Sequence, residues 1–321
     1  MKNRVILGID TSCYMTSMAA VTESGGVLGQ VRKRLAVPVS ERGLRQSEAV
    51  YVHVRQLPET ASALAEQFGP FSVCAVCASS RPRENQDSYM PVFQVGDAQA
   101  RTMSAILGIP CFHTDHQRGH LEAARLNSAI SADRFLFVHL SGGTTEILRC
   151  SPEKLEMLGG TMDLHAGQLI DRVGVAMGLS FPAGPEVEAL AARGVSRHLL
   201  PASVSKDGLH CHFSGAEAQC FRWIRNSALS PEEISAEVFD FLARSISRLL
   251  IAAAGVTGFS EALIGGGVAS SSLFRGLVRD RVQKGMPGLK VFFGSPELSG
   301  DNAVGVAMYG WRQWKKLEAG V

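Results

Sequence analysis

The sequence predicts an α/β protein built from two related lobes. Its 321 residues are long for one domain and suit two. Short apolar strands alternate with stretches of helical periodicity, a pattern typical of the α/β class. Residues 6–12 and 137–145 resemble each other, because each is an apolar strand that runs into a turn of Gly and small hydroxyl residues. These two starts lie about 130 positions apart and indicate an internal duplication.

The composition is that of an ordinary globular protein, with 45% hydrophobic and 19% charged residues. The formal net charge of +2 neither requires nor excludes a nucleic-acid partner. The apolar core of the N-terminus is too short for a signal peptide, and the apolar run at 249–256 is far below the roughly 20 residues of a membrane span. Seven scattered cysteines fit a reducing compartment. We therefore expect a cytoplasmic protein with no membrane partner.

In the first half, apolar patterning predicts strands at 5–10, 16–21 and 27–35, with a hairpin turn before the third. A helix at 47–68, a buried strand at 71–78 and a helix at 92–107 follow. The run 106–110 is interpreted as the end of that helix and a brief strand. Cys74 and Cys77 form a C-x-x-C motif, but no second pair completes a zinc site, so we expect them to pack in the core.

The second half repeats this order, with strands at 134–140, 146–150 and 154–159. Helices are expected at 165–178, then to Ala192, then to about Trp223, and at 231–254. Residues 262–272 have the pattern of a strand, a glycine turn and a helix N-terminus. Residues 298–302 precede the last helix, where Asp301 is either its N-cap or a metal ligand.

In the segment 111–125, His116 and His120 lie four residues apart. If Asp115 caps a helix there, both imidazoles project from one face with Cβ atoms roughly 6 Å apart, near enough to share an ion. Zinc and iron accept neutral imidazole readily. The alternative is a solvated helix start that happens to carry two histidines. Because the segment is polar, we expect replacement of both histidines by Ala to leave the fold intact.

The glycine turns are candidate phosphate sites. Gly lets the backbone approach phosphate oxygens, to which exposed N–H groups and hydroxyls donate. At 262–272 the N–H groups of a helix start and the positive end of its dipole would add to this. A single turn taken alone is better interpreted as a plain hairpin, and it is the pair of matching turns that favours a phosphate site.

Seven short motifs, in order, resemble the TsaD/Gcp family of tRNA threonylcarbamoyladenosine synthases, once named O-sialoglycoprotein endopeptidases. The motifs are Gly8-Ile-Asp-Thr-Ser-Cys13, His116-x-x-x-His120, Leu140-Ser-Gly-Gly143, Asp163-x-x-Ala-Gly167, Phe213-Ser-Gly215, Gly266-Gly-Val-Ala269 and Asp301-Asn302. The resemblance spans nearly the whole chain. It implies an actin/Hsp70-like (ASKHA) fold of two RNase H-like lobes with a nucleotide cleft between them. Residues 1–128, closed by a C-terminal helix at 301–321, would form the first lobe, and residues 129–300, with helical insertions, the second.

The resemblance also implies ligands and an activity. A divalent metal, iron or zinc, would be held by His116, His120 and Asp301. The adenylate of threonylcarbamoyl-AMP would lie against residues throughout the second lobe: Leu140, Ser141, Gly142, Gly143, Thr144, Asp171, Gly184 and Ser271. The family transfers the threonylcarbamoyl group to N6 of the adenosine after the anticodon in tRNAs that read codons beginning with A. Implied partners are tRNA and TsaB-like and TsaE-like proteins.

This chain departs from the family pattern beside the first turn. The family has two acids after Thr-Ser-Cys, where this chain has Tyr14 and Met15, neither of which accepts a proton at neutral pH. Asp10, the nearest acid in sequence, is therefore predicted to be the catalytic base. Further departures are Thr144 and Ser271, where the family has His and Asn. These departures favour, as the alternative, a diverged nucleotide- and metal-binding paralogue without tRNA transferase activity.

Two other classes fit less of the sequence. A metalloprotease would need an H-E-x-x-H motif, and here Glu122 follows His120 instead of lying between the histidines. A sugar or acetate kinase of the same superfamily would use a carboxylate near the first turn, such as Asp10, but would leave the paired histidines unexplained.

Overall fold

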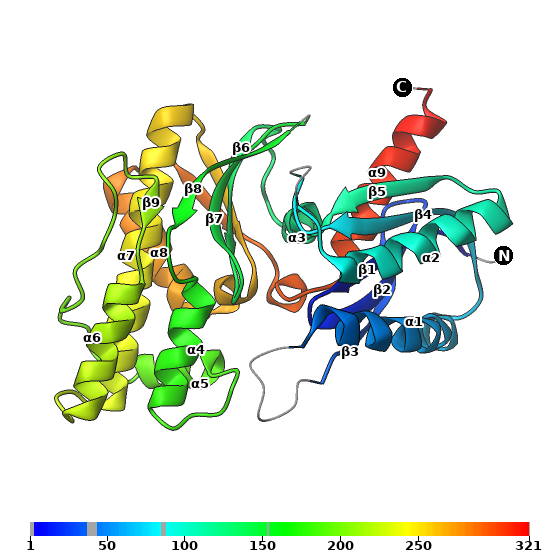
Figure 1. The fold of residues 1–321 in the computed structure, drawn as a ribbon. Helices are drawn as coiled ribbons and strands as arrows, with labels where there is room; N and C mark the ends of the chain where they lie inside the picture. Colours follow the sequence, from blue (N-terminus) through cyan, green and yellow to red (C-terminus); the bar gives the residue numbers. More distant parts are fainter. Residues whose placement is uncertain (1–2, 37–43, 85–87, 153, 321) are drawn as a thin grey trace. The chain divides into compact units, whose positions relative to one another are not determined.

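The computed structural model describes residues 3–36, 44–84, 88–152 and 154–320. The chain divides into two compact units. Residues Met1–Leu126 together with Gly300–Val321 form the first unit, and Asn127–Ser299 form the second. Each unit contains one mixed β-sheet with helices packed against it (Figure 1). Within the described residues, none of the helices has both the length and the apolar character needed to cross a membrane.

The first unit is built on a five-stranded sheet in the order β3-β2-β1-β4-β5. Its strands are β1 (Asn3–Ser12), β2 (Met15–Thr22), β3 (Val27–Arg34), β4 (Phe71–Arg81) and β5 (Cys111–Asp115). The first three form an antiparallel meander, whereas β4 and β5 join the other edge of β1 in parallel. A meander followed by parallel strands is the order expected of an RNase H-like lobe.

Helices cover both faces of this sheet. On one face, α1 (Gln46–Phe68) and α2 (Pro91–Leu107) pack over Val5, Leu7 and Ile9 of β1. On the other face, α9 (Val304–Glu318) packs over Ile6, and α3 (His116–Arg125) packs against α9. The C-terminal helix thus returns to the N-terminal sheet (Figure 1). Alternation along β1 explains this arrangement, because successive side chains point to opposite faces of a strand.

The second unit repeats the same topology. Its strands are β6 (Phe135–Leu140), β7 (Thr145–Cys150), β8 (Leu155–Thr161), β9 (His210–Cys211), β10 (Glu261–Gly265) and β11 (Lys290–Phe293). The sheet order is β11-β10-β6-β7-β8-β9, with β6, β7 and β8 antiparallel and β10 and β11 parallel to β6. Apart from β9, this order matches that of the first unit strand by strand. The internal duplication predicted from residues 6–12 and 137–145 is therefore confirmed.

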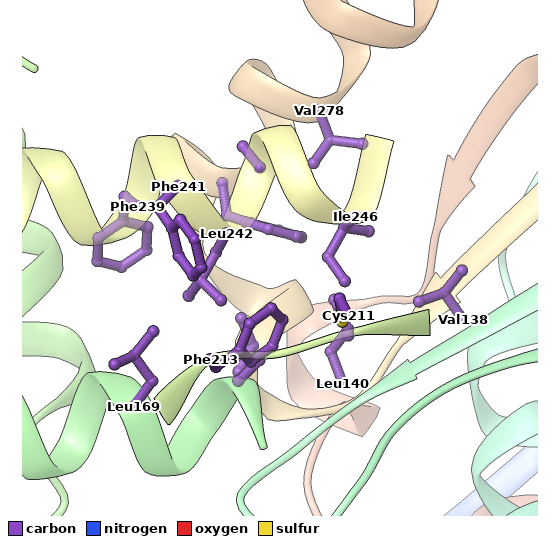
Figure 2. Close-up of a cluster of buried hydrophobic side chains, with 14 of the residues drawn as sticks. Val138, Leu140, Leu169, Cys211, Phe213, Phe239, Phe241, Leu242, Ile246 and Val278 are labelled. Carbon is purple, nitrogen blue, oxygen red and sulfur yellow. The ribbon is translucent and has the colours of Figure 1, made fainter. Parts of the chain in front are cut away.

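A helical layer encloses the core of the second unit. Its helices are α4 (Ala166–Ala176), α5 (Gly184–Ala191), α6 (Ser214–Arg225), α7 (Pro231–Thr257) and α8 (Ser272–Gly285), with 3-10 turns at Gly267–Ser270 and Pro296–Leu298. Figure 2 shows side chains from α7 converging with Phe213 and with Leu140 of β6. The rings of Phe213 and Phe241 meet edge to face, with centroids 5.5 Å apart.

The structure corrects two expectations and adds two strands. The brief strand expected within 106–110 is wrong, because Gly108 takes a left-handed conformation that ends α2, and the strand is instead β5. Strands β9 and β11 were not predicted. Asp301 is not the N-cap of α9; that helix begins at Val304, and Asn302 Oδ1 accepts from the Val304 N–H at 3.0 Å. Cys74 and Cys77 lie in β4 as expected.

Candidate metal centre and nucleotide-binding turns

The paired histidines lie at the start of α3, as predicted. Asp115 ends β5 and is the N-cap of the helix, its side chain accepting from the Arg118 N–H at 2.8 Å. This cap fixes where the helix begins, so His116 and His120 occupy successive turns of one face. The short strand and its cap therefore determine the direction of both imidazoles.

Two glycines bring the start of α9 against this helix. A Cβ atom built on Gly305 would lie 1.8 Å from the carbonyl oxygen of Gly119, and one built on Gly119 would lie 3.1 Å from the Val306 side chain. Only glycine allows the two backbones to approach this closely. Gly8 plays a similar part on β1, where a Cβ would lie 2.5 Å from the backbone of Ala303 and Ala307. These close contacts position Asp301, just before α9, beside the histidines.

His116, His120 and Asp301 form a compact cluster of ligand atoms, all within 4.8 Å of one another. The two Nε2 atoms are 3.1 Å apart. Asp301 Oδ1 lies 3.6 Å from His116 Nε2 and 3.4 Å from His120 Nε2. The side chain of His120 is 5% exposed, whereas that of Asp301 is 33% exposed, so the cluster opens to solvent on the Asp301 side.

This geometry fits a divalent cation. Ligand atoms bound at about 2.05 Å in a tetrahedral site lie about 3.3 Å apart, and the three separations here run from 3.1 to 3.6 Å. Two imidazoles and one carboxylate are donors that both zinc and iron accept. The structure thus brings together all three predicted ligands, although His116 and Asp301 are 185 positions apart in sequence.

Two side chains from the first sheet support these ligands. Asp10 is fully buried at the end of β1, and its Oδ1 accepts hydrogen bonds from His116 Nδ1 at 3.0 Å and from the Ser79 hydroxyl. Ser12 donates to Asp301 Oδ2 at 2.9 Å. Such outer contacts fix the tautomer and direction of a ligand. Sequence reasoning missed Ser12 and Ser79 as members of the site, although Ser12 belongs to the Thr-Ser-Cys turn that it singled out.

The charges of the cluster are strongly coupled. Burial disfavours the imidazolium of His116, but the charges and hydrogen bonds of Asp10 and Asp301 outweigh it and hold the pKa of His116 well above its usual value. Removal from water would raise the pKa of Asp301, but hydrogen bonds and charge from His116 and His120 hold it well below its usual value. Without a cation, the site therefore carries a proton that a metal would displace.

The two histidines do not lie in a solvated helix start, which removes the reason for expecting the fold to stay intact when both are replaced by Ala. Most of α3 is buried, including Gln117, His120 and Glu122. The His116 ring also packs against Phe93, with centroids 5.5 Å apart. The polar composition of α3 therefore does not mean that the helix faces solvent. Its buried polar residues form hydrogen bonds and ion pairs inside the protein, such as that between Glu122 and Arg312.

In the second unit, the turn after β6 holds five of the predicted nucleotide-binding residues, Leu140–Thr144. The Ser141 N–H donates to the Thr144 carbonyl at 2.8 Å, which closes the turn. Cβ atoms built on Gly142 and Gly143 would meet nothing within 4 Å, so this turn borders open space. The N-terminus of α4 abuts its other side, where a Cβ on Gly167 would lie 2.8 Å from the Gly142 nitrogen.

Of the remaining predicted residues, Gly184 begins α5, Ser271 is the N-cap of α8, and Asp171 lies in the middle of α4. Asp171 accepts from the Ala183 N–H at 2.8 Å just before Gly184 opens α5, and burial raises the pKa of this carboxyl. Ser271 caps α8 by accepting from the Phe274 N–H at 3.1 Å.

The first N–H groups of α8 already have acceptors within the protein. These N–H groups were expected to bind an anion, but Ser271 accepts from Phe274, and the Glu188 carboxylate accepts from the Leu273 N–H at 3.0 Å. The protein's own acceptors therefore occupy the two donors that a phosphate would use there. This leaves the open turn at Gly142 and Gly143 as the better phosphate site.

Two units of the same RNase H-like topology define a protein of the actin/Hsp70-like (ASKHA) class. Solved structures agree on the fold. HypF of T. kodakarensis superposes with a TM-score of 0.63 at 14% identity, over 99% of this chain and 48% of HypF. The activator of 2-hydroxyisocaproyl-CoA dehydratase from Clostridium difficile, solved with bound ADPNP, gives a TM-score of 0.57 at 11% identity, over 99% of this chain and 98% of the activator.

Within this class, residues 89–308 match the family model of TsaD, tRNA N6-adenosine threonylcarbamoyltransferase, and the chain belongs to that family. The chain is 29% identical to the tRNA N6-adenosine threonylcarbamoyltransferase of Prochlorococcus marinus (strain MIT 9313), over 98% of this chain and 91% of the relative. It is also 29% identical to the protein of the same name from Desulforapulum autotrophicum, over 96% of this chain and 93% of the relative.

Proposed function

We propose that the protein transfers a threonylcarbamoyl group from threonylcarbamoyl-AMP to N6 of an adenosine in tRNA. The observation that carries this proposal is the family match over residues 89–308, which contains His116, His120 and Asp301 in a geometry suited to one cation. A chain that had abandoned the metal would be free to lose one of these three ligands. The retained set therefore supports a working metal site, while the family match supports transferase activity over the diverged paralogue, which would bind a metal too.

His116, His120 and Asp301 hold one divalent cation, iron or zinc. Bound there, the cation would polarise the carbamoyl carbonyl of threonylcarbamoyl-AMP, a mixed anhydride, and so assist loss of AMP. The protein's own residues supply positioning: Asp10 directs His116 through Nδ1, and Ser12 directs Asp301 through Oδ2. The attacking adenine amine is a weak nucleophile, so orientation of the two substrates should provide much of the rate.

The buried environment of Asp10 argues against the role of catalytic base that was predicted from the sequence. A side chain that is 0% exposed, with Oδ1 bonded to His116 and Ser79, has no route to an incoming amine. We therefore assign Asp10 to positioning His116. Tyr14, in the turn between β1 and β2, is 42% exposed and occupies a position where the family has an acidic residue. A synthase with Tyr14 and Met15 has no carboxylate at those two positions, and water or the leaving phosphate would accept the amine proton.

The adenylate binds to the second unit. Gly142 and Gly143 border open space, which leaves room for the phosphate beside the turn after β6. Leu140, Ser141 and Thr144 shape that turn. Asp171 in the middle of α4, Gly184 at the start of α5 and Ser271 at the N-cap of α8 are assigned to the same adenylate through the family resemblance. Contacts between Gly167 and Gly142 and between Gly266 and Leu140 hold these segments together.

Transfer to tRNA implies a cytoplasmic enzyme that works with the proteins that make and deliver threonylcarbamoyl-AMP, here TsaB-like and TsaE-like partners. The test is to incubate the purified protein with threonylcarbamoyl-AMP and an unmodified tRNA that reads a codon beginning with A. The tRNA is then digested and its nucleosides are identified by mass spectrometry.

We expect N6-threonylcarbamoyladenosine at the position after the anticodon, and none in a tRNA that reads codons beginning with another base. The reaction is run with and without TsaB-like and TsaE-like proteins from the same source. Absence of the product in every combination, from protein that still binds a metal and an adenine nucleotide, would favour the diverged paralogue.

A further inference from the structure

A second cluster of reactive groups lies on the edge strand of the first unit, separate from the metal ligands. Cys111 and His113 are two residues apart on β5 and therefore share one face of the strand. The Cys111 Sγ lies 3.7 Å from His113 Nε2, and the Asp97 carboxylate of α2 lies 2.7 Å from His113 Nδ1. Asp97 is also paired with Arg101, its Oδ2 3.0 Å from the Arg101 Nε. The thiol thus contacts the imidazole, and the imidazole contacts the carboxylate.

The carboxylate determines where the imidazole proton sits. The hydrogen bond from His113, together with the charges of His113 and Arg101, holds the pKa of Asp97 below its usual value, so Asp97 is ionised and can only accept. His113 Nδ1 must therefore donate to it. In the neutral ring, Nε2 then presents its lone pair to the Cys111 thiol, which is the arrangement of a nucleophile, a base and a group that orients the base.

The cluster is accessible from solvent. The His113 side chain is 44% exposed and Cys111 is partly exposed, whereas Asp97 of α2 is buried. Partial burial and the Asp97 charge raise the pKa of the Cys111 thiol, so the thiol is not ionised beforehand and relies on a base. His113 Nε2 is placed to be that base.

We propose that Cys111 is a site of thiol–disulfide exchange with small anionic disulfides, with His113 as its general base and Asp97 as the positioning residue for His113. The Cys111 sulfur attacks one sulfur of the disulfide, and its proton passes to His113 Nε2. A Cys111–S–S–R bond forms as the R–S–S–R bond breaks. The proton then passes to the leaving R–S⁻, which departs as R–SH. The exposed Arg101 guanidinium, whose side chain is 62% exposed, favours an anionic reagent such as glutathione disulfide.

Cys74 provides a matched control on the neighbouring strand. It is also partly exposed, and burial also raises the pKa of its thiol. Its Sγ, however, donates to the Val5 carbonyl at 3.2 Å, and a carbonyl cannot carry away a proton. Burial alone predicts that both cysteines react more slowly in the folded protein than in the unfolded chain. Activation by His113 predicts the opposite for Cys111 alone.

The experiment exposes the native protein to glutathione disulfide at neutral pH, quenches samples over time and measures the occupancy of each cysteine by peptide mass spectrometry. The same rates are measured in urea-unfolded protein. We expect native Cys111 to react at least ten times faster than native Cys74, and faster than Cys111 in the unfolded chain. Native Cys74 should react more slowly than unfolded Cys74.

The variant His113→Asn keeps a donor near the Nδ1 position and removes the base that faces sulfur. It should reduce the Cys111 rate at least tenfold and leave the Cys74 rate unchanged, while Asp97→Asn should give a smaller reduction. Native Cys111 that reacts no faster than unfolded Cys111 would overturn the proposal, and this wild-type comparison holds even if a variant misfolds. A folded His113→Asn protein with the wild-type Cys111 rate would overturn the role of His113.

Discussion

Replacing Asp10 by Asn distinguishes two roles of this residue, that of a catalytic base and that of a residue that positions His116. Asn has nearly the same shape as Asp, so the buried end of β1 should keep its packing. The change removes the negative charge of the carboxylate whose Oδ1 accepts from His116 Nδ1 at 3.0 Å and from Ser79, and it leaves one neutral amide oxygen. If the amide nitrogen faces the ring instead, His116 must move its proton to Nε2, the atom that faces His120 and Asp301.

The expected loss is one of metal affinity. Removing a partner that orients a metal-bound histidine typically costs 10- to 100-fold in affinity, or about 1.4–2.7 kcal/mol. Asp10 also raises the pKa of His116, so its loss weakens competition from protons. Affinities are therefore compared at pH values high enough for each variant to have reached its plateau.

Zinc affinity is measured by competition with a chromophoric chelator. The control is Asp115→Asn at the N-cap of α3, because Asn is as good an N-cap as Asp and the Asp115 side chain accepts from the Arg118 N–H, as an amide oxygen also can. We expect Asp10→Asn to bind zinc 10- to 100-fold more weakly and Asp115→Asn to bind it within about threefold of wild type. Wild-type zinc affinity in Asp10→Asn, together with a loss of transfer, would refute the positioning role and restore Asp10 as the base.

Three further outcomes are expected. Zinc affinity should rise about tenfold per pH unit up to the raised pKa of His116, because one proton must leave the site, and should then level off. The same proton stabilises the metal-free fold. This stabilisation is fully present below about pH 6.5 and is lost as the pH rises through the pKa of His116 in the folded protein, so the free energy of unfolding of the metal-free protein, measured in urea, should fall in that range. A flat affinity profile would contradict this. Gly305→Ala should destabilise the protein by about 1–3 kcal/mol in urea unfolding, because its Cβ would lie 1.8 Å from the Gly119 carbonyl, whereas Gly276→Ala on α8, where a Cβ meets nothing within 4 Å, should not destabilise it. Gly143→Val should keep the fold yet lose AMP binding in calorimetry, since its side chain would fill the open space beside the turn, and equal affinity in both proteins would remove the site assignment.

Most of the fold could be predicted from the sequence because hydrophobic patterning is local. The strands of both meanders and the long helices α1, α2 and α7 have strong periodicity and clear ends. The edge strands β5 and β11 were harder, because an edge strand is partly exposed and loses the apolar signal of a central strand. In β5, Cys111 and His113 lie on the α2 side of the sheet and are only partly buried, so the segment lacks the apolar run of a central strand.

The candidate metal ligands could be predicted for a different reason. His116 and His120 lie on one helix, so their spacing alone places them together. Asp301 followed from resemblance to a family, because nothing local joins it to residues 185 positions away. The roles of Ser12, Ser79 and Asp10 depend on contacts across 69 to 289 positions, which no local pattern contains. Likewise, sequence cannot show that Glu188 occupies the first N–H groups of α8, since this depends on how α5 packs.

The most direct test of the central claim measures transfer as a function of bound metal. The protein is freed of metal with a chelator and then given threonylcarbamoyl-AMP, an unmodified tRNA that reads a codon beginning with A, and either no metal or one equivalent of ferrous iron or zinc. We expect no N6-threonylcarbamoyladenosine without metal, and its return with one of the two metals in wild type but not in Asp301→Asn. Full transfer by metal-free protein, or by Asp301→Asn, would contradict the account.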